Sequence, residues 1–330
     1  MMQGIDIVQD HEFLNRVSSV EKLDNDDYRT IYKMNCNEGL GLMTVYKVFT
    51  GIELVYNEFE ATTCLCDLPV YDNIIEINHC KEGRGECILL DGSSLYMGEG
   101  DLSINMMSNH ADTIGFPLKH YKGISVIIYM NEIINKVPEI LKDVNIDIYS
   151  LKEKFCNNNK CFIMRAKDKI EHIFSELYSV PESVQKAYFK LKVLELLVFL
   201  SIIDPSEEEE KEYYSKDQVE IIKQIKRFIT ENIQCRYTIE ELAKMYCISP
   251  TTLKTYFKGV YGTSIASYIK QYRIKNAAIS LRQTKNSIAD VALSVGYESQ
   301  SKFAAVFKKI MGISPLEYRK KCLEDIILQH

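Results

Sequence analysis

No part of the sequence is apolar over a length that would cross a membrane. The longest apolar stretch, Leu194 to Ile203, is interrupted by Glu195 and Ser201. A spanning helix needs about 20 predominantly apolar residues. The start of the chain also lacks a basic segment followed by an apolar core, so it does not have the pattern of a secretory signal. We therefore expect a cytoplasmic protein with no membrane partner.

Metal-binding spacings are missing as well. The chain has 10 cysteines but no CxxC pair. Cys64 and Cys66 are two positions apart, and His79, Cys80 and Cys87 follow at wider intervals. Structural zinc sites prefer tighter, paired spacings. We therefore expect no metal and no cofactor, and we expect the cysteines to be reduced thiols that fill the core as small apolar residues.

Charge divides the chain into two unequal parts. Residues 1–210 carry 20 Lys and Arg against 35 Asp and Glu, a net charge of −15. Residues 211–330 carry 20 against 11, a net charge of +9. The changeover lies at Asp204-Pro205-Ser206 and the acidic run Glu207 to Glu210, a composition typical of a linker or exposed loop. At 330 residues the chain is long enough for two domains, and a basic domain on an acidic body is the expected pattern of a polyanion-binding module.

The first part changes character near residue 130. From about 40 to 130, short apolar runs alternate with turn-forming clusters such as Asp91-Gly92 and Gly98 to Asp101, which predicts many short strands in a small barrel or sandwich. From about 131 to 203 the apolar period becomes helical. The stripe that contains Leu191 and Leu194 needs a partner, which is either the barrel itself or a second copy of the chain.

The basic part contains an internal repeat. Gly262 to Tyr268 is echoed by Gly312 to Tyr318, 50 positions on. Leu253 and Phe257 correspond to Phe303 and Phe307 at the same offset, and the segment around Ile239 corresponds to that around Ile288 at an offset of 49. Two similar helical units therefore lie in one all-α domain.

Each unit has the signals of a helix-turn-helix. In the first, Thr238 and Glu241 predict a capping box, and Ser249 with Pro250 predicts the start of a second helix. In the second, Ser287 and Asp290 start the first helix and Gly296 occupies the turn. A short helix, a tight turn and a longer helix form the plan of DNA-binding helix-turn-helix proteins. A continuous helix from about Ser264 to Thr284 is expected to join the units.

Polar residues on the second helix of each unit are the candidates for contact with DNA. Hydroxyl and amide groups suit base edges, and lysines suit phosphates. The candidates are Thr251, Thr252, Lys254, Thr255, Lys258, Ser299, Gln300, Ser301, Lys302, Lys308 and Lys309.

Residues 217–321 resemble the DNA-binding domain of the AraC/XylS family. The match of the second unit is highly specific. The first unit, from Thr238 to Gly262, also matches well. The matching residues are Ile288 to Ala292, Val295 to Ser301, Phe303, Phe307 to Lys309, Gly312 and Ser314 to Arg319.

The resemblance implies two recognition helices in successive major grooves on one face of the duplex. By position it marks Thr251, Lys254, Thr255, Gln300 and Ser301 as base-contact candidates. It also implies a core made of Ala243, Leu253, Phe257, Ile288, Ala292, Phe303 and Phe307. One departure is Ala305, which stands where some relatives carry a base-reading arginine, so the second helix is expected to read DNA with fewer polar contacts.

Family members commonly carry a cupin-like barrel and a helical dimerisation segment in front of the DNA-binding domain. The fold class expected here is therefore α+β, with a small cupin-like β-barrel or sandwich plus helices, followed by an all-α domain with two helix-turn-helix units joined by a long helix. The expected organisation is a cupin-like sensor domain over 1–130, a helical segment that is a candidate for dimerisation over 131–206, a linker over 207–215, and an AraC-type DNA-binding domain over 216–330.

The resulting hypothesis is a sequence-specific transcription regulator, activator or repressor, that responds to a small molecule in its front domain and is not an enzyme. Its expected partners are double-stranded DNA, a second copy of itself, a small-molecule effector and, for an activator, RNA polymerase. Lys33, Arg84 and Lys119 could meet an anionic effector, although surface positions suit them better. The ligand-binding residues stay unassigned.

Two alternatives are open: a ligand-binding or scaffolding protein with a vestigial DNA-binding domain, and an enzyme that carries a borrowed DNA-binding domain. A metal cupin needs two histidines one residue apart with a downstream glutamate, whereas His79, His110 and His120 are scattered. A DNA-repair alkyl acceptor needs a zinc-activated cysteine. The spacing of Cys64, Cys66, Cys80 and Cys87 offers no recognisable site of that kind.

Overall fold

The computed structural model describes residues 20–65, 73–133, 146–157, 161–166, 168–208 and 212–328. The chain divides into two compact units, Met1–Ser215 and Lys216–His330. Residues 209–211 of the predicted linker, as well as Cys66, lie outside the described residues. None of the helices in the described part of the chain is both long and apolar enough to span a membrane.

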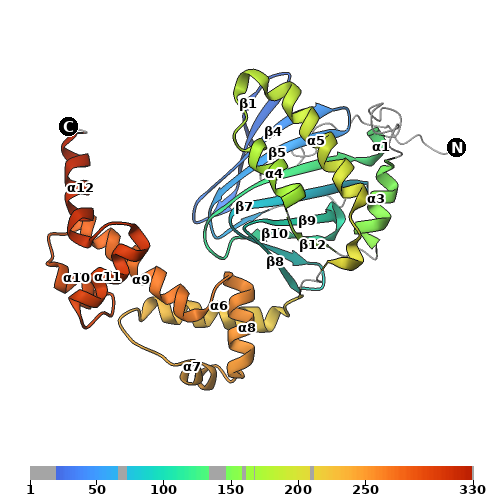
Figure 1. The fold of residues 1–330 in the computed structure, drawn as a ribbon. Coiled ribbons are helices and arrows are strands. Elements are labelled where there is room, and N and C mark those ends of the chain that lie inside the picture. Colours follow the sequence, from blue (N-terminus) through green and yellow to red (C-terminus); the bar gives the residue numbers. More distant parts are fainter. Residues whose placement is uncertain are drawn as a thin grey trace. The chain divides into compact units, whose positions relative to one another are not determined.

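The first unit is built on a curled antiparallel sheet (Figure 1). Its main path runs β1-β2-β4-β5-β11-β7-β10-β6-β3, while β8 and β9 also pair with β7, and β12 pairs with β9. The described strands are β1 (Val20–Asn25), β2 (Arg29–Met34), β3 (Cys36–Asn37), β4 (Leu40–Phe49), β5 (Ile52–Glu60), β6 (Thr63–Leu65), β7 (Ile74–Leu89), β8 (Ser94–Gly98), β9 (Asp101–Met106), β10 (His110–Gly115), β11 (Tyr121–Tyr129) and β12 (Phe162–Arg165).

Strand β7 belongs to both halves of this sheet. Its first part pairs with β9 and β11, and its second part pairs with β8 and β10. The strand passes from one set of partners to the other near Gly83, which has a φ of +83°. A shift in the register with β11 lies beside it, between Lys122 and Gly123. A Cβ on Gly83 would lie 2.0 Å from the His120 carbonyl oxygen, so only glycine allows the strands to approach this closely. The bulge and this glycine let one long strand curl from one half of the sheet into the other.

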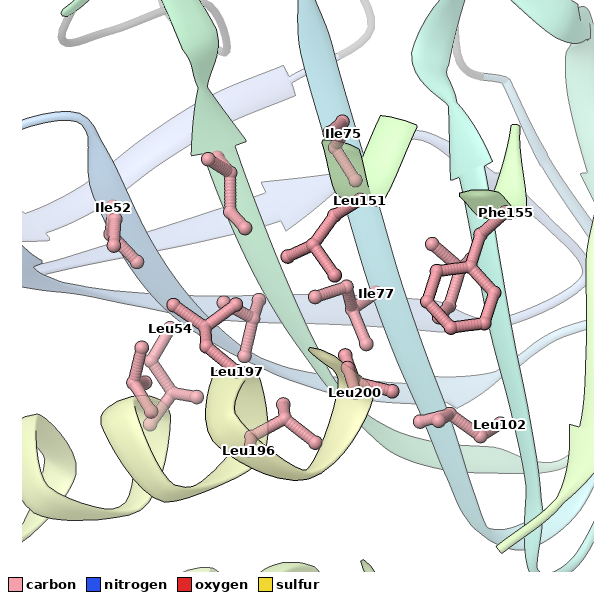
Figure 2. Packing of buried hydrophobic residues seen from close by; sticks show 14 of the residues in the cluster. Ile52, Leu54, Ile75, Ile77, Leu102, Leu151, Phe155, Leu196, Leu197 and Leu200 are labelled. Atoms are coloured by element: carbon pink, nitrogen blue, oxygen red, sulfur yellow. The ribbon is translucent and has the colours of Figure 1, made fainter. Parts of the chain in front are cut away.

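Three helices cover one face of the sheet: α3 (Ile148–Phe155), α4 (Asp168–Leu177) and α5 (Gln185–Ile202). The sheet contributes alternate residues such as Leu54 and Ile77, because successive side chains of a strand point to opposite faces. Figure 2 shows Leu151 and Phe155 of α3 and Leu196, Leu197 and Leu200 of α5 packed over these residues. This is the main core of the unit.

Within the segment predicted to be helical, Phe162–Arg165 forms strand β12. The prediction of a helical segment from about 131 to 203 is therefore wrong at these four residues. Residues 162–165 pair with residues 101–104 of β9, whose other neighbour is β7. A partner distant in sequence stabilises the extended conformation, and the local apolar period carries no information about it.

The second unit is all-helical. Its helices are α6 (Lys216–Glu231), α7 (Ile239–Met245), α8 (Pro250–Tyr261), α9 (Ile265–Gln283), α10 (Ile288–Ser294), α11 (Gln300–Met311) and α12 (Pro315–Leu328). The expected fold class is thereby confirmed, with a curled antiparallel sheet and helices in front of a helical domain that holds two similar units.

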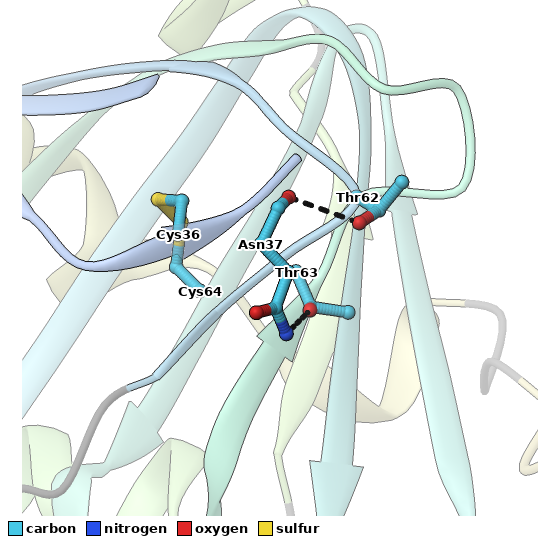
Figure 3. Close-up of a disulfide and its surroundings, with 5 residues drawn as sticks. All are labelled: Cys36, Asn37, Thr62, Thr63 and Cys64. Atoms are coloured by element: carbon cyan, nitrogen blue, oxygen red, sulfur yellow. Dashed lines mark hydrogen bonds between the residues drawn. A yellow bond between two sulfur atoms is a disulfide. The ribbon is translucent and has the colours of Figure 1, made fainter. Parts of the chain in front are cut away.

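One expectation about the cysteines is wrong. Cys36 and Cys64 form a disulfide rather than two free thiols (Figure 3). They are direct partners in the antiparallel pairing of β3 with β6, and their Cα atoms lie 4.0 Å apart. Two side chains that face each other from paired strands are close enough to be bridged. Cys80, Cys156 and Cys161 are buried free thiols, as expected.

Candidate nucleic-acid interface

The first helix-turn-helix is formed by α7 and α8, and its ends are capped as the sequence predicts. The Thr238 side chain accepts a hydrogen bond from the Glu241 N–H, and the Glu241 carboxylate accepts one from the Thr238 N–H. Ser249 accepts a hydrogen bond from the Thr252 N–H, and Pro250 occupies the first position of α8, where its missing N–H is not needed. These local bonds satisfy backbone groups that a helix start leaves open.

The second helix-turn-helix is formed by α10 and α11 in the same way. Ser287 and Asp290 make a capping box at the start of α10. Gly296 lies in the turn with a φ of +83°, and Ser299 caps α11. The equivalent turn position of the first unit is Cys247, which has a φ of +54°. The two units therefore share a left-handed turn residue, but only one of them uses glycine there.

The recognition helices α8 and α11 each bury one face. Leu253 and Phe257 of α8, like Phe303 and Phe307 of α11, have no exposed surface. Helix α9 lies between the units and packs Ile274 and Leu281 into the core that α11 shares. Of the predicted core residues, only Ile288 is half-buried rather than buried.

The opposite faces of α8 and α11 carry the predicted DNA-contacting residues. On α8, residues 251, 254, 255 and 258 follow the spacing of one helix face, and on α11 residues 301, 302, 308 and 309 do the same. Ala305 is exposed on the same helix, between residues 301 and 302 and residues 308 and 309. The side chains exposed to solvent are Thr251, Lys254, Thr255, Lys258, Gln300, Ser301, Lys302, Lys308 and Lys309.

Two of the predicted DNA-contacting residues also take part in helix capping. Thr252 is half-buried, and its hydroxyl lies 2.8 Å from that of Ser249 in the cap of α8. Ser299 is also half-buried and accepts a hydrogen bond from the Lys302 N–H at the start of α11. Each holds the first turn of its recognition helix, which is the part that enters the groove in helix-turn-helix proteins.

Arg273 of α9 is a residue of this site that the sequence patterns did not single out. It is 8% exposed, and its guanidinium donates to three backbone carbonyls. Those of Ile233 and Cys235 lie ahead of α7, and that of Gly296 lies in the turn of the second unit. A positively charged residue in a basic helical domain gives no local signal that it is buried, so only the tertiary contacts reveal its role.

The first unit has no grouped metal ligands among the residues that the structure describes. His79 is buried and stacks on Phe174, with ring centroids 4.2 Å apart. His120 lies at the surface between Glu60 and Glu82. These two histidines therefore lie in different environments, one in the core and one at the surface.

Two of the candidate cysteines in the described residues are not activated. Cys64 is in the disulfide, and burial raises the pKa of Cys80 to about 12. An activated cysteine needs its pKa lowered instead.

Known proteins resemble this chain in its helical domain. A family described as "Helix-turn-helix domain" matches residues 242–321. The chain is 33% identical over 102 residues to the regulatory protein SoxS of Salmonella typhimurium, covering 31% of this chain and 95% of SoxS. It is 34% identical over 101 residues to the arabinose operon regulatory protein of Escherichia coli, covering 30% of this chain and 35% of that protein.

Among solved structures, the C-terminal domain of AraT, a response regulator from Geobacillus stearothermophilus, is 31% identical. The match covers 31% of this chain and 84% of that domain, with a TM-score of 0.30. The paired units define a helix-turn-helix protein. This chain belongs to the AraC/XylS family of DNA-binding transcription regulators.

Proposed function

We propose that this chain is a sequence-specific transcription regulator that reads DNA through α8 and α11. The observation that carries the proposal is the pair of exposed faces, each with hydroxyl or amide groups in the first turns and lysines farther along. Threonine, serine and glutamine suit base edges, and the lysines suit phosphates. The net charge of +9 on residues 211–330 supports electrostatic binding to the duplex.

We also propose a homodimer that forms through α5. Leu191 and Val198 of α5 lie seven residues apart and are 62% and 36% exposed, and Val184, the residue just before α5, lies seven positions before Leu191 and is 48% exposed. Ile202, 67% exposed, continues this line by one turn. Apolar residues repeated every seven positions are the pattern of a helix that packs along a second helix. The opposite side of α5 is already used in the core of the first unit.

The first unit would supply the response to a small molecule. It contains a cavity of about 190 Å³ lined by residues of both halves of the sheet. Binding there would shift the protein between states with different affinities for DNA or, in an activator, for RNA polymerase.

The test is selection of bound duplexes from a random pool by the full-length protein, followed by fluorescence anisotropy at several salt concentrations. A specific regulator should bind a selected duplex at least about 10³-fold more tightly than a scrambled one at physiological salt. Hydroxyl-radical cleavage should show two protected segments about one helical turn apart, because two recognition helices enter successive grooves. Equal binding to selected and scrambled duplexes at every salt concentration would disprove the proposal.

A further inference from the structure

The cavity of the first unit has one polar wall, which the sheet itself provides. On its inner face, Asn78 of β7 lies opposite Ser125 of β11 on one side and Ser103 of β9 on the other. Glu76, two positions before Asn78, lies opposite Asn105 of β9. All five residues line the cavity. The helix-covered face of the same strands carries apolar residues such as Ile75 and Ile77.

Hydrogen bonds within this wall converge on the Glu76 carboxylate. Asn57 Nδ2 donates to Ser125 Oγ at 2.9 Å, and Ser125 Oγ donates to Glu76 Oε1 at 3.2 Å. Asn105 Nδ2 lies 3.4 Å from the other oxygen, Glu76 Oε2. Glu76 is only half-buried, although it lies in the middle of a sheet with neighbours on both sides. It is one of the residues that line the cavity.

A second carboxylate enters the cavity from the other half of the sheet. Glu86, 3% exposed, lines the cavity and accepts hydrogen bonds from Ser94 Oγ at 3.1 Å and from the Tyr96 hydroxyl at 2.7 Å. Burying a carboxylate is costly, and apolar residues would fill such a space at lower free energy. One buried and one half-buried carboxylate in the same cavity therefore indicate a binding role rather than a packing role.

Much of the remaining lining of the cavity is apolar. It includes Met34, Met43, Ile114, Phe59 and Phe116. The last two are stacked with their ring centroids 4.6 Å apart. Methionine side chains adapt to irregular shapes, and aromatic rings offer flat apolar contacts. An occupant therefore needs an apolar body as well as a polar group.

We propose that the effector is a small amine, with its ammonium group at Glu76 and an apolar body against the methionine and phenylalanine side chains, while Glu86 adds negative charge to the same cavity. This inference rests on the proposed function and names the class of its effector. The described residues that line the cavity include two carboxylates and no Lys, Arg or His. An anionic effector would therefore meet acceptors rather than cations. Of the basic residues considered from sequence, Lys33 and Lys119 are exposed and pair with Glu21 and Glu38.

Matched compounds that differ only in their polar group test this assignment. Isothermal titration calorimetry of the full-length protein would compare phenethylamine, phenethyl alcohol and phenylacetate, and then hexylamine, hexanol and hexanoate. We expect at least one amine to bind at least tenfold more tightly than its alcohol or acid counterpart. Absence of heat with both amines at millimolar concentration, or tighter binding of an acid, would overturn the proposal.

Charge-neutral variants locate the bound amine. Glu76→Gln should weaken amine binding by about 10- to 100-fold, since it removes a charge-assisted hydrogen bond. Glu58→Gln is the matched control, because this exposed glutamate lies on the other face of β5, where it pairs with Lys122. Glu86→Gln repeats the test in case Glu76→Gln does not fold. Amine binding unchanged by both cavity variants would overturn the assignment.

The selected duplex separates this inference from the function on which it rests. Specific DNA binding without amine binding would overturn the effector class and leave the regulator intact. Amine binding without specific DNA binding would do the reverse. With both present, an amine concentration just sufficient to saturate the wild type should change the dissociation constant for DNA at least several-fold in the wild type and in Glu58→Gln, and much less in Glu76→Gln, which that concentration leaves mostly unbound.

Discussion

The guanidinium of Arg273 closes over the backbone of Gly296. Arg273 Nη1 donates to the Gly296 carbonyl at 3.2 Å, and a Cβ on Gly296 would lie 2.7 Å from Arg273 Nη2. The same guanidinium donates to Ile233 O at 3.0 Å and to Cys235 O at 2.9 Å. One side chain of α9 thus joins the segment that precedes the first helix-turn-helix to the turn of the second. The position of α11 relative to α8 depends on this junction.

Gly296→Ala should therefore destabilise the protein by about 2–4 kcal/mol, since left-handed strain and displacement of Arg273 add together. Gly312→Ala is the matched control. Gly312 has a nearly equal φ of +80°, but its Cβ would meet no atom within 4 Å. That variant should lose only about 1–2 kcal/mol. Urea unfolding measures both, and equal losses would contradict the role of Arg273 at this turn.

Cys247→Gly should stabilise the protein by about 0.5–1 kcal/mol. Cys247 is exposed and has a φ of +54°, a conformation that strains an L residue but not glycine. Relief of that strain outweighs the greater freedom of glycine in the unfolded chain. Cys235→Gly, at an exposed cysteine with ordinary φ, should destabilise instead. Thermal unfolding would show the two opposite shifts, and a loss of stability in Cys247→Gly would contradict the argument.

Gln300→Ala and Lys308→Ala should alter DNA binding in different ways. Gln300 lies exposed at the first position of α11, so its loss should cost about 1–3 kcal/mol and relax preference at one base pair. Lys308 lies in the last turn of α11. Its loss should weaken all duplexes alike and reduce the salt slope by about 1. Competition with a library of single-base variants distinguishes these results, and an unchanged preference profile for Gln300→Ala would refute its assignment.

Leu191→Glu should shift the protein from dimer to monomer. A leucine buried between two α5 helices contributes about 1.5–3 kcal/mol, so its loss should raise the dissociation constant at least about tenfold. Leu23→Glu is the control, since Leu23 is also exposed, at 51%, but lies on β1. Sedimentation equilibrium measures the mass against 38.1 kDa for one chain. A monomeric wild type would end the dimer proposal.

His79 should make stability depend on pH. Burial lowers the pKa of His79 below its ordinary 6.5, although Glu171, with Oε2 at 3.2 Å from His79 Nε2, acts in the opposite direction. Asp101 opposes the shift as well, and Arg165 adds to it.

Below about pH 6.5, His79 takes up a proton in the unfolded state but not in the folded state. The stability that comes from its neutral, buried form is therefore fully present above that pH and is lost as the pH falls toward the folded-state pKa. Urea midpoints from about pH 7.5 to about pH 5.5 should fall less steeply in His79→Gln than in the wild type. Equal slopes would show that His79 does not titrate in this way.

Several features of the second unit could be predicted because their causes are local. The capping residues Thr238, Ser249 and Ser287 lie within three positions of the N–H groups that they accept. Gly296 is required by its own backbone conformation in the turn, which is a local property. The repeat of 49 to 50 residues exposed the two units without any knowledge of their packing. Such signals depend on a few neighbouring residues, and tertiary contacts did not override them.

The remaining features depend on partners far apart in the chain. Strand β12 exists because residues 162–165 meet β9, and the disulfide forms because Cys64 meets Cys36 across a pair of short strands. Glu76 belongs to a cavity wall only through its register with β9 and β11. Arg273 acts through carbonyls 23 to 40 residues away.

The sequence alone was therefore sufficient to establish the helix-turn-helix pair, because helix caps and turns are properties of short segments. The cavity, the disulfide and the buried arginine were decided by the tertiary structure, since sheet register and helix packing bring distant residues together.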